Sequence, residues 1–150
     1  MFATRARVLI ATLWVGSLWT IGYLVAPTLF ATLEDRVLAG SIAGSLFRIE
    51  AWLSLACAML LMMLLVKPGA SDTESHAQRK VLWVVGGMLL CTLIGYFGLQ
   101  PFMNALREAA GPGGVMASEA KTQFGILHGV SSAFYLIQSL LGIALALKLR

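Results

Sequence analysis

Three stretches of this chain each run for 26 residues without a formal charge, and they lie at Val8 to Leu33, Val81 to Leu106 and Thr122 to Leu147. A helix of about 20 mostly apolar residues crosses the hydrocarbon core of a bilayer, so each stretch is long enough for one span. A fourth stretch, Val37 to Val66, is equally apolar except for Arg48 and Glu50. We therefore predict an all-α, integral membrane four-helix bundle, folded as a single four-span domain over residues 1–150, with spans at about 8–33, 37–66, 81–106 and 122–147.

The composition leaves too little polar surface for a water-soluble protein of this size. Hydrophobic residues make up 59% of the chain and charged residues 12%, against about 25% charged residues in an average soluble domain. The four spans use almost the whole chain, so no soluble catalytic domain is expected. The formal net charge of +4 is better explained by membrane topology than by nucleic-acid binding, and no nucleic-acid partner is expected.

Most basic residues lie on one side of the predicted spans: Arg5, Arg7, Lys67, Arg79, Lys80, Lys148 and Arg150. Segments that carry the excess of Lys and Arg next to membrane spans are cytoplasmic. We therefore expect a multi-pass protein of the plasma membrane, specifically of a bacterial inner membrane, with both termini in the cytoplasm. A cleaved signal peptide is the alternative for the N-terminal segment, but its apolar region would cover only about 7–15 residues.

The second and third helices are predicted to be longer than a bilayer requires. Val37 to Val66 would measure about 45 Å and Val81 to Glu108 about 42 Å, against a hydrocarbon core of about 30 Å. Helices two and three should therefore extend beyond the outer membrane face. The extension of helix two contains Gly40 and Gly44 in a G-x-x-x-G arrangement, which would let another helix approach closely.

Each predicted span carries one unusual residue at a similar depth, near the outer edge of the hydrocarbon: Pro27, Arg48, Gln100 and His128. Arg48 and Glu50 are two positions apart on one helix, so they point about 200° from each other and cannot both face the bundle interior. Ionisable residues at this depth are functional-site candidates by default. Structural pairing, with Arg107, Glu119 or Lys121 as partners, or snorkelling to the interface would also account for them.

The fourth span has a polar stripe at three- and four-residue steps, formed by His128, Ser131 or Ser132, Tyr135, Gln138 or Ser139, and Gly142. Such a stripe is predicted to face protein. The opposite face is predicted to meet lipid and consists of Leu127, Val130, Phe134, Leu141 and Leu145. A matching stripe on the first span, predicted to line the same interior, consists of Gly16, Thr20, Tyr23 and Pro27.

His128 is the one histidine within a predicted span, and neutral imidazole is a common haem or metal ligand. An interhelical hydrogen bond is the more common role of a single histidine in a membrane span. No second histidine or thiol lies at this depth, so a zinc site is not expected. The cofactor is left open, and haem b, with His128 as an axial ligand, is the candidate that these residues suggest. Cys57 and Cys91 lie within spans without a C-x-x-C motif and are predicted to be packing residues.

The candidate ligand-binding residues share the outer part of the predicted bundle: His128, Ser131, Tyr135, Arg48, Glu50 and Gln100. In this set His128 would serve as ligand or proton carrier, and Arg48 as the partner of an anionic group. No catalytic residue is assigned, because the chain contains no H-E-x-x-H motif, phosphate-binding glycine loop or nucleophile elbow. An enzymatic function is therefore less expected than a binding one.

Three segments resemble the transmembrane protein 205-like family, a set of small four-span membrane proteins formerly grouped as a domain of unknown function. They are FGILHGVSSAFYL (124–136), APTLFATLEDRVLAGSIAGSLF (26–47) and LQPFMNALRE (99–108). The matching positions are Pro27, Phe30, Gly44, Phe47, Pro101, Met103, His128, Gly129 and Ser131. The chain departs from the family pattern at Phe102, where a basic residue is expected. The resemblance implies a fold and a membrane location, with no established reaction.

Three classes of function remain open at this stage. The first is a structural, partner-binding or ligand-binding membrane component, acting in the lipid bilayer with a second copy or another membrane protein. The second is a b-type haem or metal-binding redox protein, suggested by a distant resemblance to four-helix copper-resistance and protoporphyrinogen-oxidase-like membrane proteins. The third is a transporter of ions or small molecules. It would have to be oligomeric, because four spans alone are too few to enclose a transport pathway.

Overall fold

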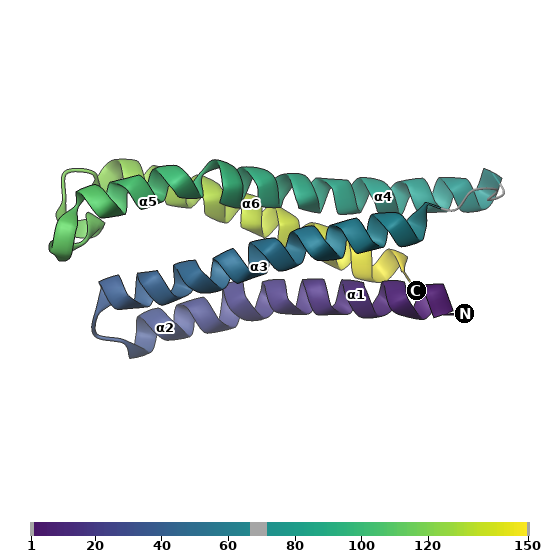
Figure 1. The fold of residues 1–150 in the computed structure, drawn as a ribbon, viewed down its shortest axis with the longest axis horizontal. Coiled ribbons are helices and arrows are strands. Elements are labelled where there is room, and N and C mark those ends of the chain that lie inside the picture. Colours follow the sequence, from purple (N-terminus) through teal and green to yellow (C-terminus); the bar gives the residue numbers. More distant parts are fainter. Residues whose placement is uncertain (1, 67–71, 150) are drawn as a thin grey trace.

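In the computed structural model of the protein, which describes residues 2–66 and 72–149, four long helical rods lie side by side (Figure 1). These residues contain no strand. Rod 1 consists of α1 (Phe2–Trp19), the π-helical segment η1 (Thr20–Val25) and α2 (Ala26–Thr32), and rod 2 is α3 (Arg36–Leu65). Rod 3 consists of α4 (Asp72–Thr92), the π-helical segment η2 (Leu93–Gly98) and α5 (Gln100–Ala109), and rod 4 is α6 (Lys121–Lys148). Two 3-10 turns, η3 (Gly111–Gly113) and η4 (Val115–Ala117), connect rods 3 and 4.

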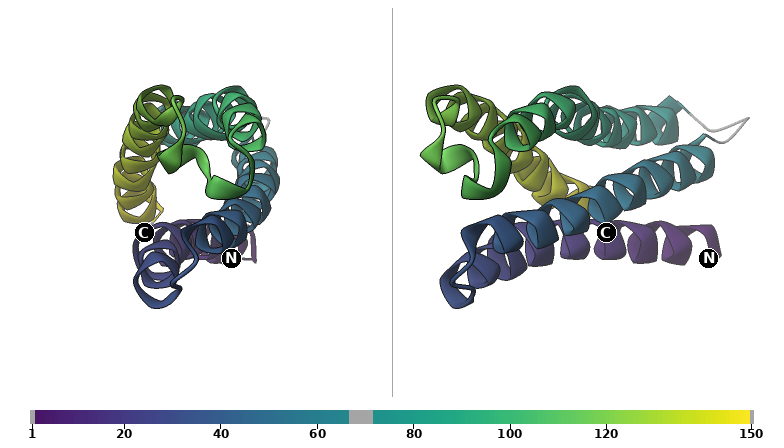
Figure 2. Two further views of the ribbon diagram at one scale, coloured as in Figure 1. Left: turned by 90° about the vertical axis from the view of Figure 1, so that its left-hand side faces the viewer. Right: turned by 60° about the vertical axis from the view of Figure 1, so that its left-hand side comes forward.

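The rods run up and down in a ring, and both ends of the chain lie at the same end of the bundle (Figures 1 and 2). Each rod contacts the next one in the ring, and α6 closes it against α1. Each contains a helix long and apolar enough to cross a membrane: Ala3–Thr32 with 30 residues, Arg36–Leu65 with 30, His76–Ala109 with 34 and Lys121–Lys148 with 28. The predicted four-helix membrane bundle is confirmed, and the chain is a small multi-pass integral membrane protein. Rod 1 is as long as rod 2, so great length is not confined to the second and third helices.

Local sequence explains why α3 begins at Arg36 and why α4 extends back to Asp72. Asp35 caps α3, because its Oδ1 accepts hydrogen bonds from the backbone N–H groups of Val37 at 2.8 Å and Leu38 at 3.0 Å. The segment 67–80, which joins the second and third predicted spans, is helical from Asp72, where α4 begins, while residues 67–71 lie outside the described part. Between Asp72 and Gly86 no Gly or Pro interrupts the chain, so nothing local stops a helix there.

A π-helical turn precedes a proline in both interrupted rods. In rod 1 the Ala26 N–H bonds to the carbonyl of Ile21, and in rod 3 the Leu99 N–H bonds to that of Ile94 at 3.0 Å. Each of these bonds spans five residues in place of four. Pro27 and Pro101 lack an N–H, and their rings crowd the carbonyl four residues earlier. The wider turns just before them accommodate both effects.

The main apolar core lies in the half of the bundle that holds the chain ends. It joins all four rods through residues such as Trp14, Leu61, Val85, Met88 and Leu145. A smaller cluster packs α5 against η4 and α6 at the opposite end, through Met103, Val115 and Phe124.

Three residues of the predicted helix faces were assigned wrongly: Leu145 on rod 4, and Gly16 and Thr20 on rod 1. Leu145 was expected to meet lipid, but it is fully buried. It follows Gln138 by seven residues, which returns an α-helix to nearly the same face, so Leu145 continues the protein-facing stripe. On rod 1 the buried face is formed by Ala11, Trp14, Val15 and Leu18, whereas Gly16 and Thr20 are exposed.

Candidate functional site

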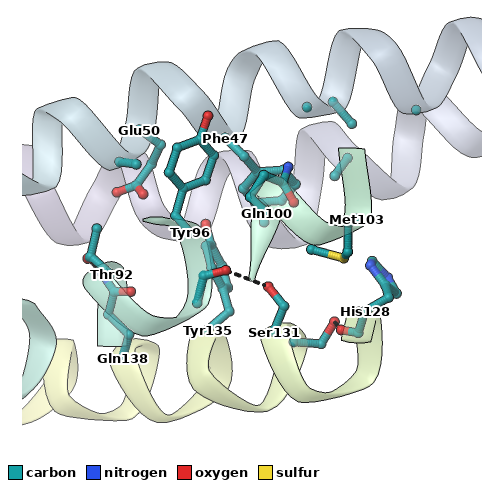
Figure 3. A pocket seen from close by; sticks show the side chains of 18 of the residues that line it. Phe47, Glu50, Thr92, Tyr96, Gln100, Met103, His128, Ser131, Tyr135 and Gln138 are labelled. Carbon is teal, nitrogen blue, oxygen red and sulfur yellow. Dashed lines mark hydrogen bonds between the residues drawn. The ribbon is translucent and has the colours of Figure 1, made fainter. Parts of the chain in front are cut away.

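A cavity of about 370 Å³ lies between the four rods, in the half of the bundle away from the chain ends (Figure 3). Every rod contributes lining residues, including Tyr23 from rod 1, Phe47 from rod 2, Tyr96 from rod 3 and Tyr135 from rod 4. Its volume falls within the range of about 300–1,000 Å³ that is typical of small-molecule sites. Both π-helical segments border it, through Gly22 and Gly95 among others.

Buried polar side chains from all four rods form the floor network, defined as Trp14, Glu50, Ser54, Thr92 and Gln138. Trp14 Nε1 donates to Ser54 Oγ at 2.7 Å, and Ser54 Oγ donates to Glu50 Oε1 at 2.8 Å. The amide nitrogen of Gln138 donates to Thr92 Oγ1 at 3.0 Å and to Ser54 Oγ at 3.4 Å. The network separates the cavity from the main apolar core beneath it.

Glu50 faces the cavity and Arg48 does not. The Glu50 side chain is 3% exposed, whereas Arg48 is exposed on the outside of the bundle. This arrangement is the one that their spacing on a helix requires. The group that bonds to the Glu50 carboxylate is the neutral hydroxyl of Ser54. The structure therefore places an acidic group on the inner surface of a membrane-embedded cavity.

Aromatic rings form the walls above the floor network. The ring of Tyr135 makes edge-to-face contacts with Phe47, at a centroid distance of 5.4 Å, and with Tyr23, at 6.1 Å. The hydroxyl of Tyr23 donates to Ser139 Oγ at 2.9 Å, and the hydroxyl of Tyr135 donates to the carbonyl of Leu18 at 2.5 Å. Both hydroxyls are thus used for bonds between rods 1 and 4, which fixes the positions of the rings.

Hydroxyl groups of α6 bind carbonyls at both π-helical segments. The Tyr135 bond reaches Leu18, just before η1, and Ser131 Oγ donates to the carbonyl of Gly95, within η2, at 3.2 Å. A membrane-spanning backbone whose regular pairing is disturbed needs such partners. Gly22 allows the close approach of rod 1, because a Cβ there would overlap the Tyr135 ring, 2.8 Å from Cζ.

Two basic side chains, Arg107 and His128, line the mouth of the cavity. The Arg107 guanidinium lies 5.0 Å above the centroid of the Phe124 ring and donates to Asn104 Oδ1 at 3.1 Å. The His128 imidazole stacks on the same ring, with centroids 6.0 Å apart and planes 6° from parallel. The sequence suggests Arg107 only as a pairing partner for the charged residues Arg48 and Glu50, whereas in the structure it lines the cavity.

Five of the six predicted site residues line this cavity: Glu50, Gln100, His128, Ser131 and Tyr135. The sixth, Arg48, lines an adjoining, more polar hollow of about 510 Å³ between rods 2 and 3. The residues that border both hollows are Gly40, Gly44, Tyr96, Gln100 and Arg107. A role for any of them in ligand binding stays a prediction. Sequence reasoning missed Trp14, Ser54 and Thr92, although a polar group deep in a span always needs a partner.

The glycine pair of rod 2 lines the cavity and makes no close helix contact with the residues that the structure describes. A Cβ at Gly40 would meet its nearest neighbour, Phe30, at 3.9 Å, and one at Gly44 would meet Arg107 at 3.9 Å. These are ordinary contact distances. The two glycines therefore leave the cavity wide where larger residues would narrow it.

No group of three or more His, Cys, Asp or Glu side chains that could hold a metal ion occurs within residues 2–66 and 72–149. Cys57 and Cys91 are free and buried, and Cys91 lines the cavity. The methionines near Cys57 in the sequence do not gather around its thiol to form a sulfur-rich metal site. Met59 is 61% and Met63 is 74% exposed, whereas Cys57 is buried. His128 stands at the mouth of the cavity, stacked on Phe124.

The fold and the site together define a four-span membrane protein with a polar-floored cavity between its helices. Residues 9–112 match a family described as a domain of unknown function, DUF4149, and the chain belongs to this family. Comparison with curated proteins and with solved structures gave no match. The matched region covers most of rods 1–3, so the cavity residues of α6 lie beyond it.

Proposed function

We propose that this protein binds a small, mostly apolar molecule within the membrane, in the cavity between its four rods. The observation that carries the proposal is the cavity itself, which has a volume of about 370 Å³ in a bundle of only four helices. Protein interiors are close-packed, and voids larger than a water molecule are few. A bundle with a purely structural role would gain by filling this space with side chains, as the main core does with Leu61 and Met88.

The lining supports a binding role. Apolar and aromatic walls with a few fixed polar groups are typical of small-molecule sites. The floor network and the Tyr135 hydroxyl bond hold the polar groups and the wall rings in place without a ligand. Such preorganisation lowers the entropy that is lost on binding.

Binding of neopentylbenzene, a compact neutral hydrocarbon, tests this proposal. Ala43 is buried and lines the cavity, so Ala43→Phe would fill part of it, while Ala56→Phe on the outer face of the same helix is the matched control. Calorimetric titration of the protein in lipid nanodiscs, with empty nanodiscs subtracted, should show saturable binding to the native chain and to Ala56→Phe. Ala43→Phe should weaken it by about tenfold or more. Equal heats for all three proteins would refute the proposal.

We further propose that the protein resides in a bacterial inner membrane with both termini in the cytoplasm. The basic residues near the start of α1, the start of α4 and the end of α6 support this orientation, because these helix ends lie at the end of the bundle that holds both termini (Figure 1). They are Arg5, Arg7, Arg79, Lys80 and Lys148. The cavity mouth would then face the outer side. Kinship with the transmembrane protein 205-like proteins is likewise a proposal, supported by the segments 26–47, 99–108 and 124–136.

A further inference from the structure

We infer that the molecule bound in the cavity is an organic cation, whose ammonium group lies next to Glu50 while its apolar part lies against the aromatic walls. This inference rests on the proposed function and specifies the class of ligand. It follows from the direction of the hydrogen bonds in the floor network, from the placement of charges along the cavity and from the rings around Glu50.

The floor network directs its hydrogen bonds toward Glu50. The indole N–H of Trp14 and the amide NH₂ of Gln138 can only donate, so Ser54 Oγ accepts from both. The single hydrogen of the Ser54 hydroxyl is then directed to Glu50 Oε1. A carboxylate has about four acceptor positions on its two oxygens. Glu50 thus ends the chain of donors as an acceptor with unused capacity, at the surface of the cavity.

The positive charges that line the cavity lie away from Glu50. A Cβ at Gly44 would lie 3.9 Å from Arg107 Nη1, and Glu50 is six residues further along α3, which is about 9 Å along the helix axis. His128 is stacked on Phe124 at the mouth, and Arg48, two residues from Glu50, lies on the opposite side of α3 and is exposed in the adjoining hollow. An ionised carboxylate in a membrane interior is stabilised strongly by a nearby opposite charge. A cationic ligand would supply that charge.

The rings beside Glu50 favour an organic cation over a metal ion. Phe47 lies one helical turn before Glu50 on α3, and its ring contacts the ring of Tyr135. Aromatic faces attract ammonium groups, including quaternary ones. Calcium and magnesium ions, by contrast, require about six or more oxygen ligands. The Tyr135 hydroxyl is already bonded to Leu18, so Tyr135 offers its ring rather than its oxygen.

A pair of ligands with the same shape and different charge tests the inference. Benzyltrimethylammonium has a quaternary nitrogen where neopentylbenzene has a carbon atom. Each ligand is titrated into the native chain, Glu50→Gln and the control Glu119→Gln, which removes an exposed acid outside the cavity. Each ligand is compared only with itself across the proteins, so different partitioning into lipid cancels.

We expect Glu50→Gln to weaken binding of benzyltrimethylammonium by at least about tenfold and to leave neopentylbenzene within about twofold, since only the cation uses the charge. Glu119→Gln should change neither. Phe47→Leu should weaken the cation more than the neutral ligand, which tests the ring independently of Glu50. If neopentylbenzene binds and benzyltrimethylammonium does not, or if Glu50→Gln affects both equally, the inference is wrong and the proposed function stands. If neither ligand binds the native chain, both are wrong.

Discussion

Ser54 joins the two parts of the floor network, because it accepts hydrogen bonds from Trp14 and Gln138 and donates one to Glu50. All four side chains are buried. A buried donor that loses its partner within a membrane has no water to replace it. Ser54 therefore stabilises the fold in two ways. Its own hydroxyl is hydrogen-bonded, and it provides a hydrogen-bond partner for Trp14, Gln138 and Glu50.

We predict that Ser54→Ala lowers the free energy of unfolding by about 1–3 kcal/mol, because it leaves the Trp14 N–H and a Glu50 oxygen without this partner. Ser45→Ala is the matched control on the same helix. Its hydroxyl is exposed and bonds only to the carbonyl of Ser41, so a change of about 0.5 kcal/mol or less is expected. Unfolding of both variants by SDS in mixed micelles measures the difference. Equal stabilities would show that the floor network contributes nothing specific.

The π-helical segments change which faces of rods 1 and 3 point inward. Below η1, rod 1 buries Trp14, Val15 and Leu18, whereas Tyr23 within η1 and Pro27 above it line the cavity. A prediction that assumes 3.6 residues per turn along the whole rod would not detect this change of face. Together with the two prolines, these segments belong to a bundle that is closely packed at one end and open around the cavity at the other.

Two glycines of rod 1 provide a matched test of how closely η1 packs against α6. Gly22→Ala would drive a Cβ into the Tyr135 ring, whereas a Cβ at Gly16 has no neighbour within 4 Å. We predict that Gly22→Ala destabilises the protein by about 1–3 kcal/mol, as overpacking typically does. Gly16→Ala should be neutral or stabilising by up to about 1 kcal/mol, because alanine favours the helix.

A double-variant cycle in the same SDS titration identifies the cause of the Gly22 effect. If the methyl group acts through the ring, Gly22→Ala should cost much less in a Tyr135→Ala background, since the overlapping atoms are gone. An unchanged cost in that background would locate the effect elsewhere in rod 1.

For the whole molecule, the sequence predicted the helices well and their rotations poorly. Long uncharged runs interrupted by Asp35 and by the basic segment at 79–80 determine the number of spans, because charge is expensive inside a bilayer. Equal distance from one membrane face was enough to gather Pro27, Gln100 and His128 around one cavity, whereas Arg48 from the same depth does not line it. The Trp14 to Ser54 bond could not be predicted, because a contact between residues 40 positions apart depends on how each rod is rotated.

The arrangement of cavity, floor network and core predicts which cysteine a water-soluble reagent reaches, and from which side of the membrane. Cys91 lines the cavity, whereas Cys57 is buried in the main core below it. A membrane-impermeant, trimethylammonium-bearing methanethiosulfonate should therefore modify Cys91 when added on the side of the connection between α5 and α6. From the side of the chain ends, the floor network and the main core should block its path.

Spheroplasts and inside-out vesicles present the two sides separately, and mass spectrometry of the purified chain identifies the modified residue. The label should appear on native protein in spheroplasts, be absent from Cys91→Ala and persist in Cys57→Ala. Because the reagent is a cation, Glu50→Gln should slow its reaction relative to that of the sulfonate-bearing analogue. Modification of Cys91 only in inside-out vesicles would reverse the proposed orientation. Equal modification of both cysteines from both sides would mean that the core does not close the cavity.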